Sequence, residues 1–204
     1  MSISAQRIDG KTFSEAFADA EKQLKRFERI GGEALETAIN QLRYASRHYL
    51  EAEKEPDSGV ALEVLKKAVS HCRRAQYDAI EAAIVVIGKS IVSFTEKFLR
   101  SSVLAVMPEY PDNYAEAVKL LEVLRTAEAP RILGPSDIDA YGDKLERLIS
   151  IWVDMRIKLP LVEKLDEEKR MAEKTATRRH VQNVLLTILG ISVAVAIAVV
   201  SKIF

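Results

Sequence analysis

LEVLKKAVSHCRRAQYDAIEAAIVVIG, residues 62–88, places apolar side chains every three or four positions and contains no proline. This spacing gathers them on one face of an α-helix. The pattern continues without a proline to Met107, so we predict one helix about 70 Å long. Gly88 is the one position inside it where a bend costs little.

Turn residues divide the chain on both sides of this stretch: Gly31 and Gly32, Pro56 to Gly59, Pro108 and Pro111, and Pro130 to Pro135. No segment between them alternates with period two, so every segment is predicted to be helical. Thr12 and Glu15 have the spacing of a capping box and mark the start of the first helix. The fold class is therefore predicted to be all-α, an elongated helical bundle.

The later helices have their own predicted apolar faces. A second helix is expected over residues 33–55, and a fourth over 111–128 that buries Tyr114, Val118 and Leu121. A fifth begins at Ser136, and Pro160 should kink or break it. Its bundle seam has 3-4 spacing and comprises Ile138, Tyr141, Leu145, Leu148 and Trp152, continuing to Met155 and Leu159.

Composition excludes several classes of protein. Thirty basic and thirty acidic side chains give a net charge of zero, so no global field attracts nucleic acid, and recognition of a DNA sequence is not expected. The lone cysteine, Cys72, cannot form an intramolecular disulfide or a cysteine zinc cage. MSISAQRIDGK lacks the apolar run of a secretory signal, so the N-terminal part is expected in the cytoplasm.

The C-terminal segment is predicted to enter a membrane. Between Val181 and Ser201 lie 21 uncharged residues, which as a helix would rise roughly 31 Å, the thickness of a bilayer core. We therefore predict a single transmembrane helix that anchors the chain in the inner membrane, with the lipid bilayer as partner. Arg178 and Arg179 before the segment and Lys202 after it are predicted to meet lipid headgroups, and the basic flank stays cytoplasmic.

Small residues recur inside this segment. Gly190, Ala194 and Ala198 are spaced by four and form a smooth stripe on which a second helix can approach closely, so they are the candidates for helix association and a homo-oligomer. Chance occurrence of this short pattern is the alternative. The predicted organisation is then a cytoplasmic bundle (1–160), a polar and basic stalk (161–180) and a C-terminal anchor (181–204).

Motifs of the standard enzyme classes are absent from the sequence. There is no glycine-rich phosphate loop, HExxH or GxSxG, and His48, His71 and His180 are interpreted as isolated from one another, so neither a metal nor a cofactor is expected. RYASRH sets Arg43 and His48 on one helix, where a cation beside a titratable imidazole can act on an RNA phosphodiester. The alternative is that both belong to a solvated face.

RYASRH (43–48), followed after the turn at Pro56 by KKAVSHCRRAQYDAIEA (66–82), resembles the helical hairpins of the HEPN-like superfamily of small bacterial defence and toxin proteins. The resemblance covers roughly residues 33–100. It implies an all-α bundle that dimerises. In active members of the superfamily an R-x(4-6)-H motif cuts RNA. That motif usually lies on the last helix of the bundle, whereas Arg43 and His48 lie on an early one. The superfamily also includes membrane-bound, non-nucleolytic members that accompany RNA-guided defence.

Three functional hypotheses follow. The first is a tail-anchored inner-membrane effector of anti-phage defence, whose oligomers perturb the bilayer or form a pore, with a cytoplasmic protein or an RNA-guided complex as partner. The second is a membrane-anchored ribonuclease that uses Arg43 and His48. The third is a non-catalytic adaptor that holds a partner at the membrane.

Overall fold

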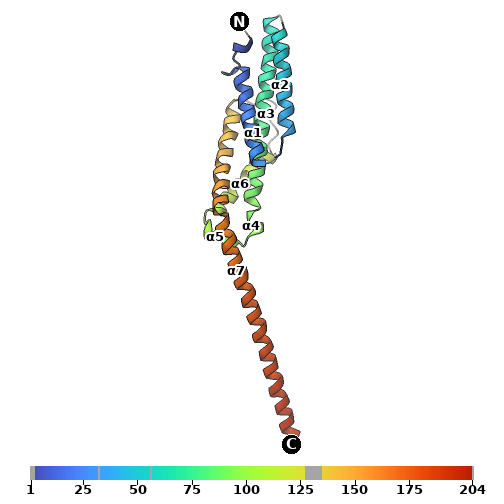
Figure 1. Ribbon diagram of the computed structural model, residues 1–204, viewed down its shortest axis with the longest axis vertical. Coiled ribbons are helices and arrows are strands. Elements are labelled where there is room, and N and C mark those ends of the chain that lie inside the picture. Colours follow the sequence, from blue (N-terminus) through green and yellow to red (C-terminus); the bar gives the residue numbers. More distant parts are fainter. Residues whose placement is uncertain (1–2, 32, 56, 127–134, 204) are drawn as a thin grey trace. The chain divides into compact units, whose positions relative to one another are not determined.

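The computed structural model describes residues 3–31, 33–55, 57–126 and 135–203 (Figure 1); the side chains at 126, 135, 136, 190 and 193–203 lie outside the description. Within these ranges the chain is helical and has no strand, which confirms the all-α class. The elements in chain order are η1 (Ile3–Ala5), α1 (Phe13–Gly31), α2 (Glu36–Lys54), α3 (Ser58–Val92), α4 (Phe94–Lys97), α5 (Arg100–Val106), α6 (Tyr110–Thr126) and α7 (Pro135–Ile203).

The chain divides into two compact units. The first comprises Met1–Phe94 and Glu109–Ile157, and the second comprises Thr95–Pro108 and Lys158–Phe204. One division falls between Ile157 and Lys158, within α7. The second unit also takes in the segment from Thr95 to Pro108, which the sequence pattern had joined to the long third helix.

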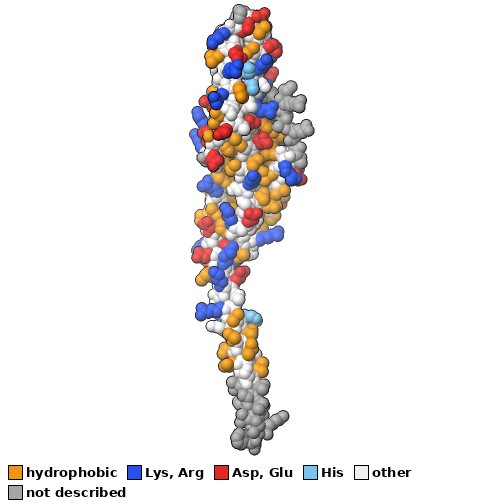
Figure 2. All heavy atoms as spheres, turned by 90° about the vertical axis from the view of Figure 1, so that its right-hand side faces the viewer, with side chains coloured by type: hydrophobic (Ala, Val, Ile, Leu, Met, Phe, Trp, Pro, Cys, Tyr) orange, Lys and Arg blue, Asp and Glu red, His pale blue; other side chains and the backbone are white. Residues whose placement is uncertain are grey.

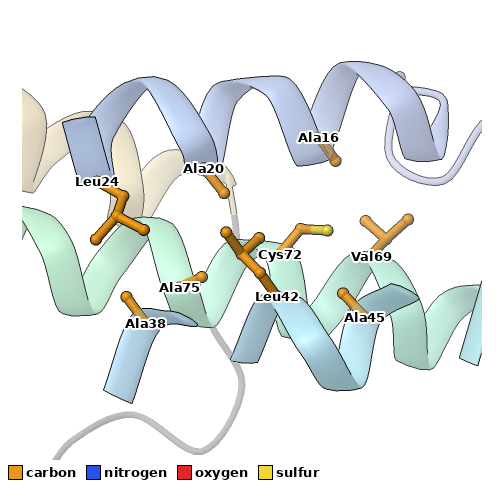
Figure 3. Close-up of a cluster of buried hydrophobic side chains, with 9 residues drawn as sticks. All are labelled: Ala16, Ala20, Leu24, Ala38, Leu42, Ala45, Val69, Cys72 and Ala75. Atoms are coloured by element: carbon orange, nitrogen blue, oxygen red, sulfur yellow. The ribbon is translucent and has the colours of Figure 1, made fainter. Parts of the chain in front are cut away.

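Small side chains form the core of the first unit where α1, α2 and α3 meet (Figure 3). Five of its nine buried residues are alanines, so the three helix backbones can approach closely. The cluster is made by Ala16, Ala20, Leu24, Ala38, Leu42, Ala45, Val69, Cys72 and Ala75. Burial raises the pKa of the Cys72 thiol to about 12, so it behaves as an apolar side chain here.

Side-chain caps fix where two of these helices begin. The Glu15 carboxylate accepts a hydrogen bond from the Thr12 backbone N–H at 2.7 Å, and the Glu15 N–H donates to the Thr12 hydroxyl at 3.3 Å, which confirms the capping box. At α3 the Asp57 side chain accepts from the backbone N–H of Gly59 at 2.7 Å and of Val60 at 3.2 Å. Both caps satisfy donors that have no partner within the helix.

The expected single helix from Leu62 to Met107 is wrong, because α3 ends at Val92. The Tyr110 hydroxyl donates a 2.7 Å hydrogen bond to the carbonyl of Ile91, so a residue of α6 satisfies one of the last carbonyls of α3. Gly88 does not interrupt α3. It is buried, and a β-carbon added there would lie 3.0 Å from the Leu121 side chain of α6.

Helix α6 packs against α3 through fewer side chains than its pattern predicts. Tyr110 and Ala117 are buried, but Tyr114 and Val118 are 38% and 36% exposed, so their predicted burial is wrong. The close contact between Gly88 and Leu121 fixes which face of α6 turns inward.

Within the first unit, α7 is joined to its neighbours by ion pairs and ring contacts. Arg26 of α1 donates to Glu146 at 2.7 Å, and Arg147 pairs with Glu116 of α6 at 3.3 Å. Among the seam residues Ile138, Leu145 and Leu148 are buried. Tyr141 contacts Tyr77 of α3 edge to face at 5.1 Å, and half-buried Trp152 lies 4.7 Å from the Arg156 guanidinium.

Pro160 was expected to kink or break this helix, and the expected break is wrong. Residues on both sides of Pro160 belong to one helix, α7. A proline removes one backbone hydrogen bond from a helix interior, and the helix here continues without that bond.

In the second unit a buried carboxylate holds the start of α5. Asp166 of α7 is only 6% exposed and accepts a 2.6 Å hydrogen bond from the backbone N–H of Leu99, the residue before α5. Arg170 donates to the other carboxylate oxygen, and Lys169 donates to the Ser101 carbonyl at 2.8 Å. Burial alone raises the pKa of Asp166, but the bonds from Arg170 and Leu99 outweigh it and hold the pKa below its usual range.

The predicted C-terminal transmembrane helix is not found in the structure. None of the helices, taken over the residues that the structure describes, is long and apolar enough to cross a bilayer. The described side chains of this segment end at Ser192. The side chains of Ala194, Ala198 and Lys202, together with Gly190, lie outside the description.

Two helical glycines, Gly88 with a close neighbour and Gly142 without one, provide a test of the contact between α3 and α6. A β-carbon at Gly142 of α7 would meet nothing within 4 Å, so Gly142→Ala should stabilise the protein by up to about 1 kcal/mol through helix propensity. Gly88→Val should instead destabilise it by about 1–3 kcal/mol, because the new side chain overlaps Leu121. Chemical denaturation measures both free energies of unfolding, and equal effects would contradict the contact.

The hydrogen bond from the Leu99 N–H to Asp166 predicts a local change in hydrogen exchange when Asp166 is replaced. Asp166→Ala should speed amide hydrogen exchange over residues 99–107, while Glu168→Ala, an exposed position on the same helix, should leave it unchanged. Because the pKa of Asp166 is lowered in the folded state, its contribution to stability is complete above about pH 3.9, its unfolded pKa, and is lost as the pH falls through the folded value. Unchanged exchange in the Asp166 variant would show that the hydrogen bond to Leu99 does not stabilise the start of α5.

Candidate functional site

Two histidines meet on the surface between α2 and α3. The rings of His48 and His71 lie 5.3 Å apart between centroids, and their planes are within 16° of parallel. The Tyr44 ring lies 5.6 Å from that of His71. The interpretation that the histidines are isolated from one another is therefore wrong for this pair.

Each imidazole is held by an oxygen acceptor. His48 Nδ1 lies 2.9 Å from Glu51 Oε2 on the same helix, and His71 Nδ1 lies 2.7 Å from Gln41 Oε1 across the helix pair. Hydrogen bonds from Arg47 and then His48 hold the pKa of Glu51 below its usual range, so Glu51 is an ionised acceptor. Both rings therefore carry a proton on Nδ1 and a lone pair on Nε2 when they are neutral.

The charge of His71 is disfavoured by its surroundings. Burial lowers the pKa of His71, and the neighbouring charges of His48 and Arg74 lower it further. The site thus keeps at least one neutral imidazole near neutral pH.

Arg43 and His48 are not brought together in the structure. Arg43 is exposed and donates to the Asn40 side chain at 3.4 Å, whereas His48 engages Glu51 and His71. Five positions along a helix correspond to about 140° of rotation around its axis, so the two side chains leave α2 in different directions. Their role in RNA cleavage stays a prediction.

The C-terminal part of α7 presents the second candidate surface. Arg178 and Arg179 are exposed, and exposed aliphatic side chains follow them from Val181 to Ile191. Figure 2 shows these hydrophobic side chains directly after the last basic ones. The predicted association residues Gly190, Ala194 and Ala198, and the predicted headgroup contact at Lys202, lie outside the described side chains.

No group of three or more His, Cys, Asp or Glu side chains that would hold a metal ion occurs in the described part of the chain. Sequence reasoning named His48 but missed His71 as its neighbour. Part of the signal was available in the hairpin: Gln41 and His71 are each 15 residues from Pro56, so the two antiparallel helices bring them level. His48 follows Gln41 by seven positions, about two turns, and so lies on the same face of its helix.

No protein-family profile, curated protein or solved structure matches this chain. The resemblance to the HEPN-like superfamily therefore stays a prediction that rests on RYASRH and the helix after it.

The lowered pKa of His71 predicts how stability depends on pH. A histidine whose folded pKa lies below its unfolded value of about 6.5 contributes full stability above that value and loses it as the pH falls through the folded pKa. The thermal midpoint should therefore fall between pH 7.5 and pH 5, and less steeply in His71→Gln. His180→Gln, at an exposed position of α7, should retain the wild-type slope; the same slope in all three proteins would rule out His71 as the source.

Proposed function

We propose that this chain attaches to anionic lipid surfaces through residues 178–191 of α7 and acts there as a helical-bundle effector. The proposal concerns binding at the interface between headgroups and acyl chains. It is carried by one observation: a stretch of aliphatic side chains that lies open to solvent just after two arginines.

The exposure of this stretch is unusual for large aliphatic residues. Leu186 is 66% exposed and Leu189 is 64% exposed. Exposed aliphatic surface of this extent marks a region that binds a partner or a membrane. The members of the stretch are Val181, Val184, Leu185, Leu186, Ile188, Leu189 and Ile191.

The distribution of these side chains around α7 favours lipid over a single partner helix. At about 100° per residue they occupy an arc of roughly 220° around the axis, in which Gln182 and Ser192 are the polar members, while Asn183 and Thr187 lie one turn apart on the remaining face. One partner helix covers only a narrow stripe, whereas the acyl chains of a lipid leaflet surround a broad apolar arc.

The hydroxyl groups of the segment donate their hydrogen bonds to the helix backbone, so they do not depend on water as an acceptor. Thr187 donates to the Asn183 carbonyl at 2.9 Å, and Ser192 donates to the Ile188 carbonyl at 2.8 Å. Since their donors are already satisfied by the helix, both side chains are compatible with an apolar environment.

The neighbouring charges supply the preference for anionic lipid. Arg178 and Arg179 are exposed, and only His180 separates them from the aliphatic stretch. Basic residues beside a membrane surface each contribute about 1 kcal/mol of attraction to anionic headgroups. Homo-oligomerisation, bilayer perturbation and a place in anti-phage defence stay predictions, the last resting on the family resemblance alone.

Flotation of the full-length chain with vesicles tests the proposal. Vesicles containing phosphatidylglycerol should bind the chain, and Leu185→Gln with Leu189→Gln should weaken binding more than about tenfold, since each leucine contributes about 1.5–3 kcal/mol on burial. The matched control, Asn183→Gln with Thr187→Gln, changes the opposite face and should bind like the wild type.

Charge provides the second arm of the same experiment. Arg178→Gln with Arg179→Gln should weaken binding about tenfold or more at low salt, and by less at high salt because the attraction is screened. Wild-type binding by the leucine variant would overturn the proposal. So would a chain that buries the leucines by self-association in buffer and does not float with vesicles.

A further inference from the structure

A small cavity lies in the first unit, where the turn before α1 meets α1, α3 and the start of α7. Its volume is about 90 Å³. Three of the residues that line it, Ala16, Val69 and Ile138, are apolar and buried. Figure 3 shows Ala16 of α1 and Val69 of α3 facing one another. The cavity therefore has an apolar base, while its other lining side chains are charged or polar.

The turn before α1 forms one wall of the cavity. Two backbone hydrogen bonds, of 2.8 and 3.2 Å, join Ile8 and Lys11, and between them Asp9 and Gly10 have φ angles of +47° and +84°. An aspartate with a left-handed φ persists where its surroundings hold it. Here Arg73 of α3 does so, because its guanidinium lies 2.7 Å from the Asp9 carboxylate. The ion pair fixes this wall against α3.

Polar groups of the cavity are left available to a ligand. Among the residues that the structure describes, neither the Gln76 amide nor the Asp139 carboxylate has a hydrogen-bond or ion-pair partner. Arg73 also retains donors, since a guanidinium has five N–H groups and Asp9 accepts from only one of its nitrogens. The cavity thus offers a carboxylate acceptor on one side and guanidinium donors on another.

The charges of the lining indicate which ligand fits. Lys11 and Arg73 are positive and Asp9 and Asp139 are negative, so the lining has no net charge. In so small a space a lone ammonium ion at Asp139 is repelled by the two basic groups, and a lone carboxylate at Arg73 is repelled by the two acidic ones. A molecule that carries both charges is complementary to both sets.

We propose that this cavity binds a small zwitterionic α-amino acid. The ligand carboxylate accepts hydrogen bonds from Arg73, and the ligand ammonium group donates to Asp139 and to the Gln76 side-chain carbonyl. The site is separate from the lipid-binding segment, residues 178–191, and does not depend on it.

The volume restricts the ligand to a short side chain. A cavity of about 150 Å³ takes up benzene, which has roughly six heavy atoms. The cavity here, at about 90 Å³, has room for no more than that number. Glycine and alanine are of this size, and the alanine methyl group would lie on Ala16, Val69 and Ile138. Leucine and phenylalanine are too large to enter without displacing the buried base.

Isothermal titration calorimetry of the full-length chain tests the proposal with ligands of matched size. L-alanine should bind with a Kd below about 1 mM. Propionate lacks the ammonium group and ethylammonium lacks the carboxylate, so each should bind at least about tenfold more weakly, because polar groups of the cavity stay unpaired. L-leucine should also bind at least about tenfold more weakly than L-alanine. Failure of L-alanine to bind, or equal affinity for either singly charged analogue, would overturn the proposal.

Substitutions assign the two contacts. Asp139→Asn should weaken L-alanine binding at least about tenfold through loss of a charge-assisted hydrogen bond, and it should retain the fold because Asp139 has no partner among the described residues. The matched control, Asp143→Asn, is an exposed position one turn further along α7 that does not line the cavity, and it should bind like the wild type. Wild-type affinity in Asp139→Asn would overturn the proposal, as would weakened binding in Asp143→Asn.

The basic side has its own readout. Arg73→Gln should weaken binding of L-alanine at least about tenfold but should not weaken binding of ethylammonium, which has no carboxylate for Arg73 to hold. General collapse of the cavity would instead weaken both ligands alike, and that result would show that Arg73 holds the turn in place but does not recognise a carboxylate, contrary to the proposal.

Discussion

The close approach of α1, α2 and α3 is the constraint on which the first unit depends. It is possible because alanines occupy the positions where the helices face one another, so backbones rather than long side chains set the spacing. Alanine also has the highest helix propensity, so the same residues favour the helices and their contact. The spacing in turn decides which surface groups meet, including the imidazoles of His48 and His71.

Features that act over a few residues could be predicted from the sequence. The Thr12 and Glu15 capping box and the turn before α3 depend on side chains within three positions of the backbone groups they satisfy. The end of α3 could not be predicted, because no proline or glycine marks it. A distant residue contributes there instead, because the Tyr110 hydroxyl donates to the Ile91 carbonyl at the end of α3. The start of α5 depends in the same way on Asp166, which accepts the Leu99 N–H.

The candidate site was predicted only in part, for a related reason. Periodicity assigns a residue to a face of its own helix but does not say which residue of the next helix lies opposite. His48 was therefore paired with Arg43 on α2, whereas its neighbour in space is His71 of α3. The aliphatic character of the C-terminal segment was visible in the sequence, but the described residues do not form a helix that spans a membrane.

Cys72 lies at the centre of the three-helix contact, fully buried, with its thiol pKa raised to about 12. At neutral pH it forms almost no thiolate while α1, α2 and α3 stay together. A thiol-specific reagent can therefore modify the chain only during moments when these helices separate. The sequence has no other cysteine, so the labelling rate of the native protein directly reports how often its own core opens.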